Sequence, residues 1–288
     1  NIYGVDINEE SVEITKLSLF LKIARKNKKL IDLSNNIKQG NSLVSDENID
    51  KRAFNWEKEF PFKFDIVIGN PPYVEARSIE QKFVDFLRKN YKTSGNRINT
   101  FASFIERGIN LLKEESYFGF IIHRNLIRSN DYQKTRRFIL DNSKIKQILS
   151  FTQGVFEGVT GEMTILILNK TKEKKEDNTI LIYKHNNKII PNLNPEKIKQ
   201  GIFEETAGNR FNIYLTDKKI ELLEKIKGGC VKMGTVAETL QGIIVGNEKK
   251  YISKKKENDK YKPVLRGKDI SCYGFPEPKE YVYYVSGT

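Results

Sequence analysis

The sequence contains little cysteine, histidine or methionine, and it has no long apolar run. Its two cysteines, Cys230 and Cys272, are too few for a disulfide scaffold and too far apart for a Cys-x-x-Cys metal site. Its two histidines, His123 and His185, argue against a histidine-based zinc site. The longest apolar runs, such as residues 118–122, are far shorter than a bilayer requires, and there is no signal peptide. We therefore expect no metal site, no membrane span and a cytoplasmic protein.

The composition is that of a folded, basic protein. Hydrophobic residues make up 38% of the 288 residues and aromatic residues 11%, which supports a sizeable core and excludes wholesale disorder. The formal net charge is +13. Its excess lies in residues 75–150, with 15 basic and 8 acidic side chains, and in residues 249–288, with 10 and 5. Two basic zones suggest a polyanionic partner such as nucleic acid, although solvated lysine-rich faces would give the same count.

Hydrophobic patterning predicts alternating strands and helices. Strands are expected over residues 2–5, 37–39, 64–69, 117–122, 145–151 and 162–169. Helices are expected from Asn8 to about Ala24 and over residues 98–113, 132–140 and 216–227, with a charged turn over 170–177. This alternation indicates a parallel α/β sheet. After Gly228 the sequence changes to scattered glycines and short β-branched runs, so we place a domain boundary there.

One tetrapeptide, Asn70-Pro71-Pro72-Tyr73, follows a strand that reads as buried. In open α/β sheets, ligands bind at the carboxyl ends of the strands. The two prolines fix φ and donate no N–H. The side-chain oxygen of Asn70 and the carbonyl of Pro71 can therefore accept both hydrogens of one planar amine, which draws its lone pair out of conjugation. Tyr73 adds a ring face for stacking. An ordinary Asn-Pro turn is the alternative interpretation.

These four residues resemble the catalytic motif of amino-group methyltransferases that use S-adenosylmethionine. Further segments follow in the order found in adenine-specific (N6) DNA methyltransferases, particularly the type IIG restriction–modification group, and the resemblance covers essentially the whole chain. It implies an α/β fold, with a Rossmann-like class I methyltransferase sheet followed by part of a β-rich α+β target-recognition domain. The implied divisions are a partial catalytic domain over 1–175, a connecting segment with a helix over 176–228, and the start of the recognition domain over 229–288.

The same resemblance implies a cofactor site. Residues 3–6 resemble the strand whose acidic residue binds the cofactor ribose, and residues 40–43 resemble the motif whose polar side chain contacts the cofactor adenine. Residues 101–106 resemble the helix whose aromatic residue packs on that adenine. The implied cofactor contacts are Asp6, Ile7, Asn41, Ser42, Asn70 and Phe104. A capping aspartate, an ordinary turn and a core phenylalanine are the corresponding structural alternatives.

The resemblance also implies direct methyl transfer to a base that has left the duplex. A paired adenine must be flipped out, at a cost of a few kcal/mol. Tyr73 and Phe156 would stack on it, offsetting ~1–3 kcal/mol for each aromatic partner. The amine held by Asn70 and Pro71 would attack the sulfonium methyl in line and lose its proton afterwards. This mechanism needs no strong base, and His123 is expected to be structural.

Residues 231–288 resemble the start of the family's target-recognition domain. The implied contacts to the phosphates of double-stranded DNA are Lys249, Lys250, Lys254, Lys255, Arg266 and Lys268. Such contacts position a duplex without reading its sequence. An unrelated, basic, β-rich domain is the alternative.

One departure from the family is the absence of a glycine-rich cofactor loop. No Gly-x-Gly pattern stands before Ile2, and the chain opens on residues that read as a strand already in progress. We therefore expect a fragment of a longer protein that lacks the first, central strand. We expect it to bind S-adenosylmethionine weakly or not at all and to be inactive alone. The exposed sheet edge is a possible site of self-association with another chain.

Three functions stay open at this point. The first is adenine-specific DNA methylation within a restriction–modification system, with an endonuclease fused or associated outside this sequence. The second is amino-methylation of a protein glutamine or an RNA guanine by the same tetrapeptide. The third is a DNA-binding specificity module without activity. The intact Asn70 and Pro71 favour the first two, and the basic regions favour DNA over the smaller substrates.

Overall fold

The structure is a computed structural model of the chain. It describes all residues except 24–31, 96–97, 152–154, 156–160, 174, 186–193, 216, 232, 239–241, 244, 271–273, 275 and 285–288. The chain forms two compact units, Asn1–Glu221 and Leu222–Thr288, so the division falls inside helix α8 (Asp217–Gly229). No helix in the described part of the chain is long and apolar enough to cross a bilayer.

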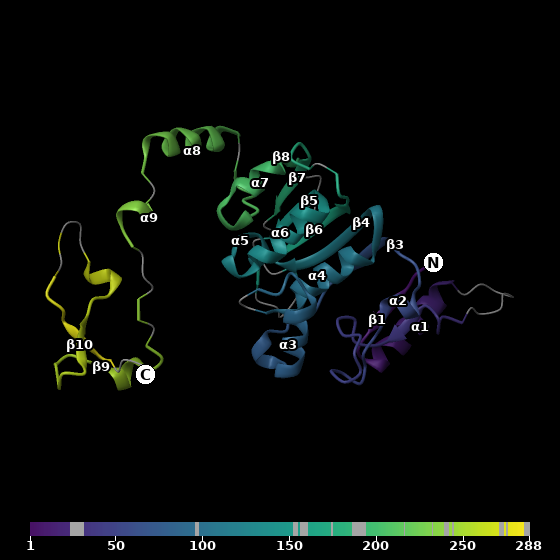
Figure 1. Cartoon of the computed structure of the whole chain (residues 1–288), viewed down its shortest axis with the longest axis horizontal. Coiled ribbons are helices and arrows are strands. Elements are labelled where there is room, and N and C mark those ends of the chain that lie inside the picture. Colours follow the sequence, from purple (N-terminus) through teal and green to yellow (C-terminus); the bar gives the residue numbers. More distant parts are fainter. Residues whose placement is uncertain are drawn as a thin grey trace. The chain divides into compact units, whose positions relative to one another are not determined.

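The first unit alternates strands and helices through most of its length (Figure 1). Its elements are β1 (Gly4–Asp6), α1 (Glu9–Ile23), β2 (Ile37–Gln39), α2 (Trp56–Glu59), β3 (Phe64–Gly69), α3 (Gln81–Asn90), α4 (Thr100–Leu111), β4 (Leu112–His123), α5 (Asn125–Arg128), α6 (Gln133–Asn142), β5 (Ser143–Phe151), β6 (Met163–Lys170), β7 (Thr179–His185), β8 (Glu196–Lys199) and α7 (Gly201–Glu205). Three 3-10 helices, Ala76–Ser78, Asn130–Tyr132 and Ala207–Asn209, lie between them. The predicted elements are all present within a few residues, whereas α3, β7 and β8 were not expected.

The strands form a parallel pair, β1–β2, and a six-stranded sheet in the order β3-β4-β6-β5-β7-β8. The α/β class is confirmed, but the expectation of a wholly parallel sheet is wrong. β3 and β4 are parallel, while β6 runs antiparallel to both β4 and β5. The connection between β5 and β6, residues 152–162, has eleven residues, which is just below the dozen or more that a crossover to a parallel neighbour needs.

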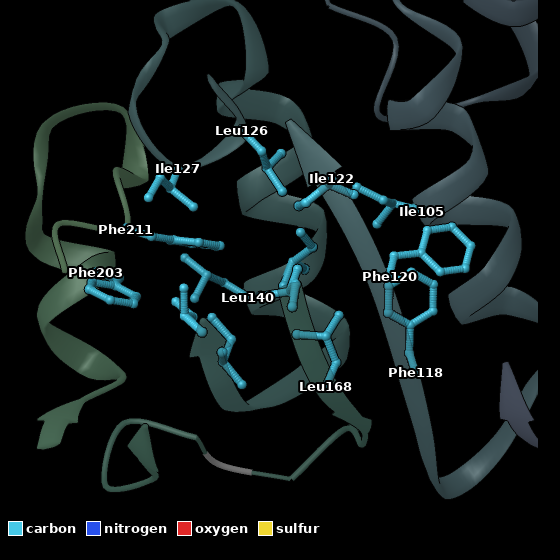
Figure 2. Close-up of a cluster of buried hydrophobic side chains, with 14 of the residues drawn as sticks. Ile105, Phe118, Phe120, Ile122, Leu126, Ile127, Leu140, Leu168, Phe203 and Phe211 are labelled. Carbon is cyan, nitrogen blue, oxygen red and sulfur yellow. The ribbon is translucent and has the colours of Figure 1, made fainter. Parts of the chain in front are cut away.

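The core lies where α4 and α6 pack against one face of the larger sheet. Phe101, Ile105 and Ile109 recur at four-residue spacing on α4 and are almost fully buried. Along β4, buried residues alternate with residues that are more exposed, as expected for a strand whose sheet is covered on one face. Figure 2 shows Ile105 beside the phenylalanines of β4 and Leu140 among the same cluster. This core holds β3 and β4 rigidly in register.

An aromatic cluster ties β1 to the start of β3. The ring of Tyr3 lies 5.9 Å from that of Phe64 and 5.3 Å from that of Phe60, and Trp56 lies 6.1 Å from Phe64. Among the described residues, β1 pairs only with β2 and β3 only with β4. The two strands therefore start close together, yet their facing edges share no hydrogen bonds. A hollow opens between them.

The second unit contains a small antiparallel sheet, β10-β11-β9, formed by β9 (Ile252–Ser253), β10 (Tyr261–Val264) and β11 (Glu280–Tyr283). Short helices α9 (Met233–Val236) and α10 (Glu248–Tyr251) and a 3-10 helix, Gly267–Asp269, accompany it. The tyrosine rings of residues 251 and 283 stack with their centroids 6.5 Å apart. The unit has the β-rich α+β character expected from the sequence.

Candidate active site

The carboxyl ends of β1, β2 and β3 open into one hollow of about 1430 Å³. Asp6 ends β1, Gly40 follows β2 and Asn70 follows β3. The predicted site residues that line the hollow are Asp6, Ile7, Asn41, Ser42, Asn70, Pro71, Pro72, Tyr73 and Phe104. The structure therefore brings every predicted catalytic and cofactor residue to one place, although they come from segments spread over a hundred positions. Phe156 lies outside the described residues.

The loop that follows β3 is held by the first residue of α4. The hydroxyl of Thr100 donates to the carbonyl of Pro72 at 2.7 Å and accepts from the backbone N–H of Val74 at 3.2 Å. The backbone N–H of Thr100 in turn donates to the carbonyl of Val74 at 3.0 Å. Thr100 is 3% exposed, so water does not compete for these bonds. Sequence reasoning missed this residue, because no local pattern links positions 72 and 100.

This clamp leaves a defined pair of acceptors. The carbonyl of Pro72 is already bonded to Thr100, whereas the carbonyl of Pro71 receives no hydrogen bond from any described residue. Asn70 is exposed at the wall of the hollow. The carbonyl of Pro71 and the exposed side chain of Asn70 are therefore two groups of this loop that can accept from an amine, although the Asn70 oxygen also has the hydroxyl of Tyr73 near it.

Tyr73, the last residue of the tetrapeptide, contacts β4, Asn70 and α4. Its hydroxyl oxygen lies 2.8 Å from the carbonyl oxygen of Ile121 on β4 and 3.0 Å from the side-chain oxygen of Asn70. Its ring leans on that of Phe101, with centroids 5.8 Å apart. Partial burial raises the pKa of Tyr73 to about 12, so the phenol stays protonated near neutral pH. Tyr73 is still 37% exposed, which leaves one part of its ring open for stacking.

The ends of β1 and β2 are drawn together by a close backbone approach. The N–H of Gly40 donates to the carbonyl of Asp6 at 2.8 Å. A Cβ on residue 40 would lie 2.7 Å from the Cβ of Phe54, so only glycine fits there. One oxygen of the Asp6 carboxylate accepts from the N–H of Asn8 at 2.8 Å. The other has no partner among the described residues, which leaves it free to accept from a ligand hydroxyl.

Asn41 is more enclosed than the sequence suggested. Its side-chain amide donates to Asp50 at 2.8 Å, its side-chain oxygen accepts from the N–H of Leu43 at 3.1 Å, and it is 6% exposed. Burial raises the pKa of Asp50, but hydrogen bonds from Asn41 and Arg52 outweigh it and bring that pKa below its ordinary value. Asp50 is thus a charged anchor that sequence reasoning missed. It orients Asn41 and leaves one lone pair on the asparagine oxygen for a ligand.

Phe104 combines the two interpretations that the sequence left open. It is partly buried and packs against both hydrophobic clusters of the unit, and it also lines the hollow. The segment after β2, which also lines the hollow, is fixed by the indole of Trp56, whose N–H donates to the carbonyl of Ser42 at 3.1 Å.

His123 accepts a hydrogen bond from the N–H of Asn125 at 3.1 Å, and burial lowers the pKa of His123. No group of three acidic, histidine or cysteine side chains in the described regions is placed to hold a metal ion.

The predicted phosphate contacts belong to the second unit. Lys249, Lys250, Lys254, Lys255 and Lys268 are exposed there. Arg266 differs, because its guanidinium pairs with Glu280 at 2.7 Å and with Glu248 at 3.1 Å. Hydrogen bonds to these two carboxylates raise the pKa of Arg266. Arg266 therefore joins α10 to β11, and a phosphate would have to compete with both carboxylates for it.

Comparison with known proteins places the chain among modification enzymes. The model of the Eco57I restriction-modification methylase family matches residues 1–156. The type II restriction enzyme and methyltransferase RM.Eco57I of Escherichia coli is 30% identical over 186 residues, which are 59% of this chain and 19% of that protein. The type II methyltransferase M.VspI of a Vibrio species is 26% identical over 95% of this chain and 60% of its own length. The chain thus spans only part of its relatives.

Among solved structures, the type IIG restriction endonuclease BpuSI superposes with a TM-score of 0.54. It is 18% identical in sequence, and the match covers 81% of this chain and 29% of that chain. At this identity the similarity concerns the fold. It agrees with the mixed α/β fold of the first unit.

Proposed function

Because the chain belongs to the Eco57I restriction-modification methylase family, we propose that it is the methyl-transferring part of an adenine-specific DNA methyltransferase. The proposed reaction moves a methyl group from S-adenosylmethionine to the exocyclic amine of an adenine in double-stranded DNA. The protein would act within a restriction–modification system in the cytoplasm. The name of its relative RM.Eco57I joins restriction and methylation in one protein, which supports a fused or associated endonuclease.

The observation that carries this proposal is a pair of acceptors beside the hollow. The carbonyl of Pro71 has no donor among the described residues, and the side-chain oxygen of Asn70 has only the hydroxyl of Tyr73 near it. Pro71 and Pro72 offer no N–H, and Thr100 occupies the carbonyl of Pro72, so an incoming amine meets the side-chain oxygen of Asn70 and the carbonyl of Pro71. Two acceptors on one NH₂ group hold both hydrogens and free the nitrogen lone pair for attack. An adenine inside a duplex cannot reach them, so the base must be flipped. We propose that Tyr73 and Phe156 then stack on it.

The hollow fits the nucleoside part of S-adenosylmethionine. The free oxygen of Asp6 suits a ribose hydroxyl, the open face of Phe104 suits an adenine ring, and the oxygen of Asn41 suits its amine. Ile7, Ser42 and Asn70 would complete the contacts. When bound, the cofactor supplies an electrophilic methyl group on sulfur. The chain's own residues orient the two reactants and shield the amine from water.

The decisive experiment measures transfer of labelled methyl groups to unmethylated DNA of mixed sequence. It compares this chain, the longest natural protein that contains it, and the Asn70→Ala variant of that protein. The expected product is N6-methyladenine, formed by the longer protein and lost in the variant. Label in RNA or protein would favour an amino-methyltransferase that acts on an RNA guanine or a protein glutamine. DNA binding without any label would favour a specificity module without activity.

We further propose that this chain alone binds S-adenosylmethionine weakly and is inactive. Between β1 and β3, no described residue presents a glycine-rich turn to cradle the methionine end. Calorimetry on this chain should show no binding at micromolar cofactor, and micromolar affinity would overturn this proposal. The unpaired edge of β3 also supports self-association, since Ile66 and Ile68 are 63% and 79% exposed there. Light scattering that shows only monomers would contradict it.

The exposed lysines of the second unit support contacts with DNA phosphates. We propose that Lys249, Lys250, Lys254, Lys255 and Lys268 position the duplex, with Arg266 contributing after release from its carboxylates. Such contacts would make binding strongly dependent on salt. The sequence specificity would come from other groups.

A further inference from the structure

The hydroxyl of Tyr73 has two neighbours but only one proton to give. One neighbour is the carbonyl oxygen of Ile121, 2.8 Å away, and the other is the side-chain oxygen of Asn70, 3.0 Å away, so the hydroxyl faces two acceptors. A backbone carbonyl can only accept, and a phenol donates once. A carboxamide can present either its oxygen or its NH₂ group, because the two ends exchange by a half-turn of the side chain. The proton count therefore decides which way Asn70 faces.

The two distances favour one arrangement. Hydrogen bonds of the O–H···O type are commonest at about 2.7–2.8 Å, and those of the N–H···O type at about 2.9–3.0 Å. We propose that the side-chain NH₂ group of Asn70 donates to the hydroxyl oxygen of Tyr73, which donates its own proton to the carbonyl of Ile121. The reverse arrangement would leave two oxygens facing each other at 2.8 Å with no proton between them. It would also occupy the oxygen of Asn70 that the substrate amine needs.

This arrangement gives Tyr73 a second role, as a positioning residue for Asn70. The relay anchors the asparagine amide to β4, whose place is fixed by the core, and turns its oxygen toward the substrate. The ring of Tyr73 keeps its contact with Phe101 and its stacking face, so the two roles belong to different atoms. The consequence for methyl transfer rests on the proposed function. The orientation of Asn70 does not, and it can be observed directly.

The Tyr73→Phe variant separates the roles because it keeps the ring and removes the hydroxyl. Tyr117→Phe is the matched control. Tyr117 lies on β4, the strand that also carries Ile121, it is 49% exposed, and its hydroxyl has no hydrogen-bond partner among the described residues. Measured in the longest natural protein that contains this chain, loss of one orienting hydrogen bond should lower kcat by about 3- to 10-fold. KM for DNA should change less than about twofold, because ring stacking is kept. The ratio of the wild-type kcat to the Tyr73→Phe kcat should be the same at pH 7 and at pH 9, because the phenol of Tyr73 is protonated at both.

A second readout needs no activity. With asparagine labelled with ¹⁵N, the side-chain NH₂ signal of Asn70, assigned from its loss in Asn70→Ala, should shift in Tyr73→Phe and stay in place in Tyr117→Phe. An unmoved signal, or a kcat equal to or above that of the wild type in Tyr73→Phe, would overturn the relay. If the longest natural protein that contains this chain transfers no methyl group to DNA, or if its Asn70→Ala variant is active, the proposed function is overturned instead. The signal of Asn70 would still report on the relay.

Discussion

Thr100→Val should destabilise the protein by about 1–3 kcal/mol, because it removes a buried hydroxyl to which two backbone groups are hydrogen-bonded. The carbonyl of Pro72 and the N–H of Val74 both bond to that hydroxyl, and the site is 3% exposed. Valine has nearly the shape of threonine, so packing is kept and the loss is polar. A buried group left without its hydrogen bond costs about 1–3 kcal/mol. For a domain of this size the melting temperature should fall by roughly 2–4 °C per kcal/mol.

In the longest natural protein that contains this chain, the same change should slow methyl transfer. If about 1.4 kcal/mol of loop positioning is lost in the transition state, kcat falls about tenfold. KM for S-adenosylmethionine should stay within about twofold, because Thr100 contacts the loop and not the wall formed by Asp6 and Asn41. Thr100→Ser keeps the hydroxyl and should restore most of the activity and stability. Thermal unfolding and steady-state kinetics measure the two effects separately.

Thr164→Val is the matched control for the Thr100 experiment. Thr164 is 0% exposed, and its hydroxyl has no hydrogen-bond partner among the described residues. The same substitution there removes an unsatisfied group, so stability should be unchanged or rise by about 1 kcal/mol. Equal destabilisation by Thr100→Val and Thr164→Val would show that the bonds to Pro72 and Val74 do not hold the loop.

Three further outcomes follow from the same geometry. Gly108→Ala should lower stability by about 1–3 kcal/mol in thermal unfolding, because its Cβ would lie 2.6 Å from the ring of Phe118. Asp6→Asn should raise KM for S-adenosylmethionine about tenfold and leave KM for DNA unchanged, as one charge-assisted bond is worth roughly 1.5 kcal/mol. Lys254→Gln and Lys255→Gln should each reduce the slope of log affinity for DNA against log salt by about 1, measured by titration at several salt concentrations.

The parts of the site that the sequence could predict are those set by short stretches of chain. The apolar run of β3 and the prolines after it mark a strand end whatever else the chain does. The same holds for Asp6 at the end of β1 and Asn41 just after β2. Ligands bind at the carboxyl ends of strands in α/β sheets, and these residues do line one hollow, although β1–β2 and β3–β4 belong to separate sheets. Phe104 was expected from the resemblance of residues 101–106 to the family's helix, and it lines the same hollow.

The groups that hold these residues were beyond a single sequence. Thr100 and Pro72 are 28 positions apart, and Tyr73 reaches Ile121 over 48 positions. Neither pair has a pattern of its own, since a threonine at a helix start and a tyrosine after proline each have many local explanations. Asp50 looked like an ordinary loop acid. The antiparallel course of β6 was missed for a related reason, because an apolar strand does not record the direction of its neighbour.

The exposed isoleucines of β3 connect the fold to the cofactor question. A strand that reads Phe-Asp-Ile-Val-Ile-Gly has the near-continuous apolar character of strands buried on both faces. Val67 meets that expectation by packing on the core, whereas Ile66 and Ile68 are 63% and 79% exposed beside the hollow. Such surface is unfavourable in water, at roughly 25 cal/mol per Å². Among the described residues, the edge of β3 that pairs with no strand therefore forms part of the wall of the proposed cofactor site.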